Sequence, residues 1–160
     1  VELVNLLDAN QDSTAVINFG ARSNSGITQY GETLMGLLED LKRKLVTFWV
    51  INTDRDGLEL LKDYLPVVEG SLVHVVKNTY FGNDDRFDLY NNSKLKQQIE
   101  ASGGKSLVFP KLLPMVSREL YNNRLTIKAA IADTNVPIGN RGVLKAWQKK
   151  CEEVFSEAIQ

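Results

Sequence analysis

The sequence predicts an α/β fold of three layers, in which a mostly parallel sheet is flanked by helices. Short runs rich in β-branched and other apolar residues alternate with segments whose apolar residues recur at helical spacing. About ten or more residues separate successive runs, the length that a crossover helix between parallel strands needs. Four strands are expected, over residues 14–19, 45–51, 71–77 and 106–109.

Length and composition indicate one domain covering residues 1–160. The chain is 43% hydrophobic and 24% charged, which excludes collagen, a disordered tail and a disulfide scaffold. A net charge of −1 requires neither nucleic acid nor an anionic membrane as a partner. No apolar run approaches the roughly 18 residues of a membrane span. The single cysteine, Cys151, forms no internal disulfide, so the sequence predicts a cytoplasmic protein.

The first half of the chain begins with a helical turn over residues 2–7. The run at 14–19 is closed by Gly20, which suits a buried strand, and a helix is expected over 27–44. Residues 45–51 are apolar at nearly every position, as in a central parallel strand, and a helix over 58–65 follows.

The second half continues the alternation. The strand at 71–77 leads through a polar loop to a helix over 92–101, which Gly103 and Gly104 cap before the strand at 106–109. Two short helical pieces flank Asn122 and Asn123, and a final helix is expected over 141–158.

Several apparent motifs carry no chemistry. The Gly104-Lys105-Ser106 triplet is not a phosphate-binding loop, because Ile99 stands where that motif needs glycine and the triplet opens a strand. His74 lies within a β-branched run and is interpreted as a structural residue. One histidine and one cysteine are too few for a His/Cys zinc site.

Ligands bind parallel α/β sheets at the carboxyl ends of the strands, so the residues after each strand are the candidates for a site. Residues 16–21 run from an apolar strand into a loop, residues 75–78 end a strand in Asn, and residues 107–110 end one in Pro. In their order and spacing, these segments resemble the C-terminal two-thirds of ParA/MinD-type P-loop ATPases. Those deviant-Walker proteins partition, maintain or mobilise plasmids.

The resemblance implies binding of ATP or ADP with Mg²⁺. Asn78 would read the adenine edge, since an amide offers both a donor and an acceptor. It would equally suit a turn that ends a strand. Asn18, where the family usually has Asp, would contact Mg²⁺ through water. The implied cofactor-binding residues are Asn18, Gly20, Asn78, Pro110, Lys111 and Leu112.

The resemblance also implies a P-loop NTPase-like fold whose N-terminal phosphate-loop unit is missing. In the family, that Gly-rich, Lys-containing loop lies ahead of the position of Val1. The chain is therefore expected to be a fragment of a larger nucleotide-binding domain. It would act as an ATPase only with that loop restored.

Three functions stay open at this level. The first is a nucleotide-dependent dimerisation switch in plasmid partition, maintenance or mobilisation, with a homodimer, a partner protein and indirect or non-specific DNA contacts as partners. The second is a non-enzymatic α/β protein-interaction module. The third is an α/β enzyme that uses Asp54 or Asp56, which follow the strand at 45–51, on a small substrate.

Overall fold

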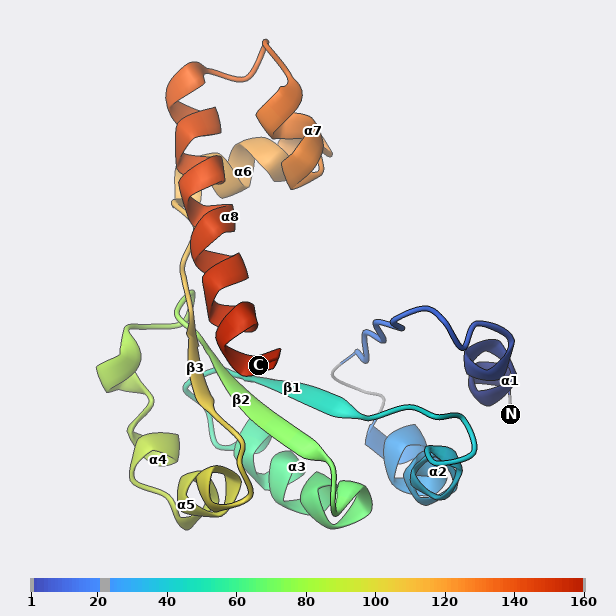
Figure 1. Cartoon of the computed structure of the whole chain (residues 1–160). Helices are drawn as coiled ribbons and strands as arrows, with labels where there is room; N and C mark the ends of the chain where they lie inside the picture. Colours follow the sequence, from blue (N-terminus) through green and yellow to red (C-terminus); the bar gives the residue numbers. More distant parts are fainter. Residues whose placement is uncertain (1, 21–23, 160) are drawn as a thin grey trace.

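A computed structural model describes residues 2–20 and 24–159 and confirms the three-layer α/β fold (Figure 1). Its parallel sheet has three strands in the order β1-β2-β3, the order of the sequence. The strands are β1 (Val46–Ile51), β2 (Leu72–Asn78) and β3 (Ser106–Phe109). Three of the four expected strands are therefore confirmed.

Helices cover both faces of this sheet. One face carries α3 (Asp56–Tyr64), the 3₁₀ turn η1 (Leu65–Val68), α4 (Asp88–Asn91) and α5 (Lys94–Ala101), with the short turn η2 (Asp84–Arg86) leading into α4. The other face carries the C-terminal part of α8 (Ile138–Ile159). The remaining helices are α1 (Glu2–Ala9), α2 (Asn24–Leu37), α6 (Pro114–Asn122) and α7 (Ile127–Ala132).

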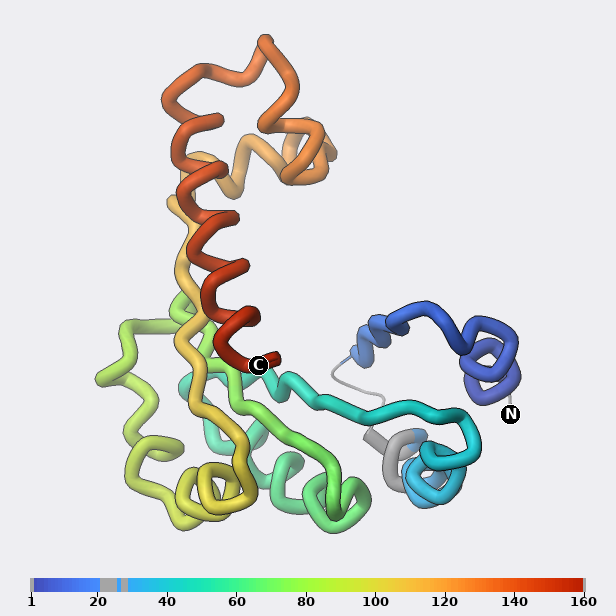
Figure 2. The backbone as a smooth tube through the Cα atoms, in the orientation of Figure 1, coloured from blue at the N-terminus to red at the C-terminus, as the bar shows by residue number. Residues whose placement is uncertain are grey.

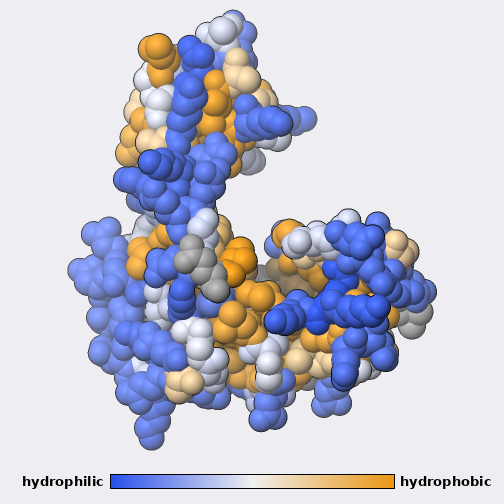
Figure 3. Space-filling view, viewed as in Figure 1, coloured by the Kyte–Doolittle hydropathy of each residue, from blue (hydrophilic) through white to orange (hydrophobic). Residues whose placement is uncertain are grey.

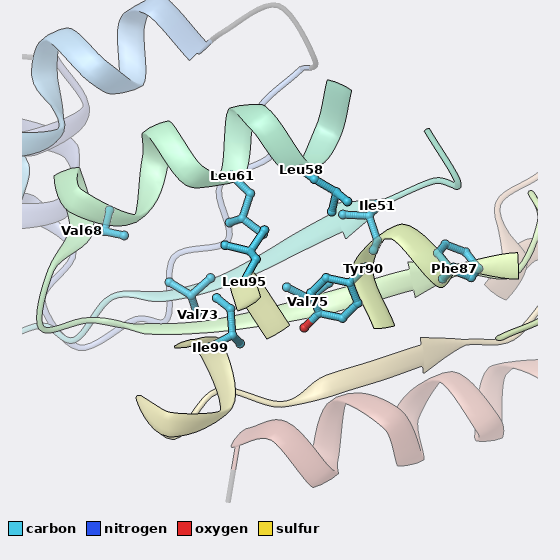
Figure 4. Packing of buried hydrophobic residues seen from close by; sticks show 10 residues of the cluster. All are labelled: Ile51, Leu58, Leu61, Val68, Val73, Val75, Phe87, Tyr90, Leu95 and Ile99. Carbon is cyan, nitrogen blue, oxygen red and sulfur yellow. The ribbon is translucent and has the colours of Figure 1, made fainter. Parts of the chain in front are cut away.

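The central strand β2 is buried on both sides, and alternate residues serve different cores. Val73 and Val75 face the larger core, where Leu61 of α3 and Ile99 of α5 pack against them. Figure 4 shows this cluster, with Leu58 and Leu61 pointing from α3 toward the sheet. Val76 faces the opposite core, which β3 and α8 complete through Leu107, Phe109, Val154 and Ala158.

A helical lobe formed by α6, α7 and the N-terminal half of α8 stands away from the sheet (Figure 1). Its own small core consists of Val116, Ala130, Val136 and Leu144. Figure 2 traces the chain from β3 into this lobe and back along α8 to the sheet. At the joint, the indole Nε1 of Trp147 donates to the carbonyl of Pro110 at 2.7 Å, and the indole ring contacts Phe109 edge-on. These two contacts fix the lobe to the end of β3.

The strand predicted over residues 14–19 is wrong, because residues 14–20 form irregular backbone. Val16 is 92% exposed, and Ile17 and Phe19 are exposed as well. An apolar run becomes a strand only where a neighbouring strand accepts its hydrogen bonds. Within the described residues the sheet ends at β1. The helix predicted to reach residue 44 also ends earlier, at Leu37.

The chain reversal between α5 and β3 follows the prediction. Gly103 adopts a φ of +84°, the left-handed conformation that favours glycine, and the amide of Gly104 donates to the carbonyl of Ile99 at 2.9 Å. Gly104 lies directly against β2. A Cβ atom on it would stand 2.1 Å from the carbonyl oxygen of Val73. Only glycine allows the backbone of this reversal to approach β2 so closely.

His74 is fully buried between β2 and α8, which agrees with its interpretation as a structural residue. Its Nδ1 accepts a hydrogen bond from the amide of Lys105 at 3.0 Å, and its ring stacks on Phe48. Burial, with a smaller contribution from the positive charge of Lys105, lowers the pKa of His74 below its usual value. His74 is therefore neutral in the folded protein at neutral pH.

We expect Gly104→Ala to lower the free energy of unfolding by about 1–3 kcal/mol or more, because the added methyl group would displace Val73 or Ile99. Urea denaturation measures this change. Gly36→Ala in α2 is the matched control, since no atom of the described residues lies within 4 Å of its added methyl group. That variant should be neutral or up to about 1 kcal/mol more stable. Equal effects of the two changes would contradict the close approach at Gly104.

We expect the stability of the protein to fall as the pH drops from about 7 to about 5. The unfolded chain takes up a proton at His74 near its ordinary pKa of about 6.5, whereas the folded chain resists it until lower pH. His74 thus contributes a stabilisation that is present above this range and lost within it. Urea denaturation at several pH values should show a shallower slope for His74→Gln. An unchanged slope would exclude His74 as the titrating group.

Candidate functional site

The carboxyl edge of the sheet holds Asn78, which ends β2 opposite Phe109 of β3. The Oδ1 atom of Asn78 accepts a hydrogen bond from the amide of Tyr80 at 3.0 Å. The hydroxyl of Thr79 donates to the carbonyl of Phe109 at 2.7 Å and ties this turn to β3. The side chain of Asn78 therefore closes a turn at the strand end, one of the two roles that its sequence position allows.

The loop after β3 meets this turn. The ammonium group of Lys111 lies 5.9 Å from the centre of the Tyr80 ring. Pro110 accepts the hydrogen bond from Trp147, and Leu112 packs against the core of the helical lobe. The structure thus brings Asn78, Pro110 and Lys111 to one edge of the sheet, while Leu112 supports the lobe.

The remaining predicted site residues, Asn18 and Gly20, lie in the irregular segment that follows α1. Residue 21, the last of the predicted switch loop, lies outside the described residues. In the described part of the chain, no group of three or more His, Cys, Asp or Glu residues could hold a metal ion. Asp54 accepts a hydrogen bond from Asn52 at 2.8 Å and so closes its own loop.

Lys77 is a residue of this edge that the sequence analysis missed. Lys77 is only 5% exposed, and its ammonium group forms an ion pair with Asp84 and lies 3.3 Å from Oδ1 of Asn91. Because Lys77 lies on the same face of β2 as Val73 and Val75, strand alternation alone indicates a buried charge that needs a partner. The ion pair fixes the loop between β2 and α4 to the sheet.

Charge is distributed unevenly between the helical lobe and the rest of the chain. Residues 111–150 contain eight Lys and Arg but only two Asp and Glu, a net charge of +6. The other residues contain 11 Lys and Arg against 18 Asp and Glu, a net charge of −7. The net charge of −1 for the whole chain conceals this separation.

The positive side chains of the lobe come from several elements. On α8, Arg141, Lys145 and Lys149 follow one another at intervals of four residues and therefore share one side of the helix. Arg118 of α6 and Lys128 of α7 are exposed to solvent. Figure 3 shows hydrophilic residues along the column that joins the lobe to the sheet. Within the described residues, one of the lobe's positive side chains forms an ion pair, that of Lys149 with Glu153 at 3.9 Å.

A shallow hollow lies on the lobe at the C-terminal end of α6. Leu120 and Leu125 form its apolar part and pack against the lobe core. Its polar residues are Ser117, Asn122 and Arg124, and Tyr121 stands beside them with 85% of its surface exposed. The lobe therefore offers positive charge, an exposed aromatic ring and hydrogen-bonding groups within one region. That combination is typical of surfaces that bind nucleic acids.

Comparison with known proteins finds a relative of nearly the whole chain. The chain is 46% identical over 159 residues to Protein MobD of Acidithiobacillus ferrooxidans, a match that covers 99% of this chain and 69% of that protein. No family model matches the chain, and no solved structure matches it.

These findings overturn the predicted resemblance to ParA/MinD-type ATPases, which is wrong. The segments that suggested it are short, and a strand that ends in Asn or Pro suits any parallel α/β sheet. The first of them, residues 16–19, does not form a strand at all. Binding of ATP, ADP or Mg²⁺ and formation of a homodimer stay predictions. Among the residues that the structure describes, no helix is both long enough and apolar enough to cross a membrane.

We expect Asp84→Asn to lower the free energy of unfolding by about 1–3 kcal/mol, because the buried ammonium group of Lys77 would lose its counter-ion. Glu59→Gln is the matched control, since Glu59 and its partner Lys62 are both more than half exposed. That change should cost no more than about 1 kcal/mol. Chemical denaturation of both variants measures the two changes in the free energy of unfolding. Equal losses would show that the partner of Lys77 is dispensable.

Proposed function

The chain belongs to the family of Protein MobD, and on that premise we propose that it is an accessory protein of plasmid mobilisation that binds DNA through its helical lobe. The name of the relative is of the mobilisation type, and mobilisation is a process that acts on DNA. The observation that carries the proposal is the net charge of +6 in residues 111–150, beside a net charge of −7 in the rest of the chain.

This distribution favours DNA as the partner of the lobe. Positive side chains without carboxylate partners bind phosphates and release the counterions condensed on DNA. On α8, the four-residue step between Arg141 and Lys145 corresponds to a rise of about 6 Å, close to the rise of about 7 Å across two nucleotides of one strand along the axis of a duplex. The negative remainder of the molecule repels DNA, so the field orients the lobe toward it.

A protein-interaction module is the second candidate function. Val50 on β1 is 61% exposed, and Val46 on the same side of that strand is exposed as well. β1 is also an edge strand among the described residues, so it could pair with an extended segment of a partner protein. A chain without affinity for DNA at low salt would favour this candidate over DNA binding.

We expect the double change Lys128→Gln and Lys145→Gln to weaken binding of a short duplex DNA of any sequence. The logarithm of the binding constant should fall linearly with the logarithm of the salt concentration. The variant's slope should be shallower by about 0.9 for each phosphate that the lobe no longer neutralises. Fluorescence anisotropy of a labelled duplex, measured at several salt concentrations, gives both quantities.

The matched control for this experiment is the double change Lys62→Gln and Lys94→Gln, on α3 and α5. It removes the same charge from the acidic part of the molecule and should leave the affinity and the slope nearly unchanged. A control that weakens binding as much as the lobe variant would mean that net charge, and not the lobe, governs the affinity. That result would refute the proposed surface.

A further inference from the structure

Tyr121 is the most exposed aromatic residue in the part of the chain that the structure describes. It belongs to the last turn of α6, one residue before that helix ends, so its backbone is held in regular structure. On the opposite side of α6, Val116 is fully buried in the lobe core and fixes the orientation of the helix. The helix therefore presents the ring of Tyr121 to solvent from a rigid support.

The turn after α6 places Arg124 close to this ring. Arg124 adopts a φ of 49°, a conformation that few residues with a side chain adopt. Its amide donates to the carbonyl of Tyr121 at 3.2 Å, and the next amide, of Leu125, donates to the carbonyl of Leu120 at 3.0 Å. These two hydrogen bonds fix the turn. The backbone of Arg124 is thus fixed close to that of Tyr121, and both residues line the same hollow.

The hollow between these residues combines an apolar surface with polar groups. Leu120 and Leu125 supply the apolar surface, and the hydroxyl of Ser117 and the amide of Asn122 supply donors and acceptors. Both residues are exposed to solvent. A flat, polar-edged aromatic group fits such a surface, with its face on Tyr121 and its edge toward Ser117 or Asn122.

We propose that this hollow binds an unpaired base of single-stranded DNA, with Tyr121 stacking on the base and Arg124 holding an adjacent phosphate. The inference rests on the proposed DNA-binding function of the lobe and names the form of DNA that the lobe prefers. Every base has a face that stacks on an aromatic ring, so the contact needs no particular sequence. A base within a duplex is already stacked on both faces and cannot cover Tyr121.

The lengths of the lobe's helices also argue against sequence-specific recognition of duplex DNA. In a helix-turn-helix unit, the second helix enters the major groove and contacts the edges of the bases. Here the helix after the turn, α7, has only six residues and contributes Ala130 to the lobe core. Less than two turns of a partly buried helix cannot act as a recognition helix. The exposed groups therefore suit a flexible single strand better than a duplex groove.

The test compares Tyr121→Ala with Tyr121→Phe, which keeps the ring, and with Tyr30→Ala, which removes an exposed tyrosine from α2. Each protein is titrated with a ten-nucleotide oligothymidine, an abasic strand of the same length and a duplex. Tyr121→Ala should weaken binding of oligothymidine by about 5- to 150-fold and leave the abasic strand and the duplex unchanged. Tyr121→Phe and Tyr30→Ala should behave as the unmodified protein does.

The outcomes separate this inference from the function on which it rests. If the unmodified protein binds none of the three DNA ligands, DNA binding by the lobe is refuted. If the unmodified protein binds all three, Tyr121→Ala could weaken binding of the single strand and the duplex equally, or weaken binding of neither. Either result would leave DNA binding in place and overturn the base-stacking site. A fourth titration uses a ten-nucleotide oligouridine, the RNA equivalent. Tighter binding of that strand than of oligothymidine would overturn the assignment to DNA.

Discussion

Burial of β2 on both of its faces is the constraint on which the rest of this molecule depends. Val73 and Val75 require the cover of α3 and α5, and Val76 requires that of α8 on the other side. Once both covers are in place, the two flanking strands pair with β2 through evenly spaced parallel hydrogen bonds. The direction of α8 is then set at its C-terminal end, and the far end of the same helix supports the lobe. The location of the basic surface is therefore a consequence of packing against the sheet.

Sequence patterns predicted most of the helices and three of the strands, because the apolar spacing of each of these segments matches its structure. Residues 45–51, 71–77 and 106–109 are strands because their apolar residues meet partners that the same chain supplies. Residues 14–19 are also rich in apolar residues but have no strand beside them within the described residues, and local sequence does not reveal whether a partner exists. The reversal at Gly103 was predictable because its signal is local. Strand pairing is not local, and the prediction over 14–19 failed for that reason.

The candidate site was predicted less well than the fold. The rule that ligands bind at the carboxyl ends of strands pointed to Asn78, Pro110 and Lys111, which do lie together. The role predicted for them came from a resemblance that the comparisons overturn. The basic lobe was missed because charge was summed over the whole chain, in which a net charge of +6 in one segment and of −7 in the rest nearly cancel. A sum over the segment between β3 and the middle of α8 would have revealed it. Tyr121 needed the structure, since an exposed and a buried tyrosine look alike in a sequence.

The joint at Trp147 has a consequence for observing this protein in solution. The chain has two tryptophans, and they report on different parts of the molecule. Trp49 donates to the carbonyl of Gly57, and its ring contacts that of Tyr64 in a tilted arrangement, inside the layer that α3 forms on the sheet. Trp147 donates to Pro110, where the sheet meets the lobe. With one indole replaced by phenylalanine, the fluorescence of the other becomes a native optical signal for a single location. The opening of the joint at Trp147 and the unfolding of the layer that α3 forms on the sheet can then be recorded separately, without an attached dye.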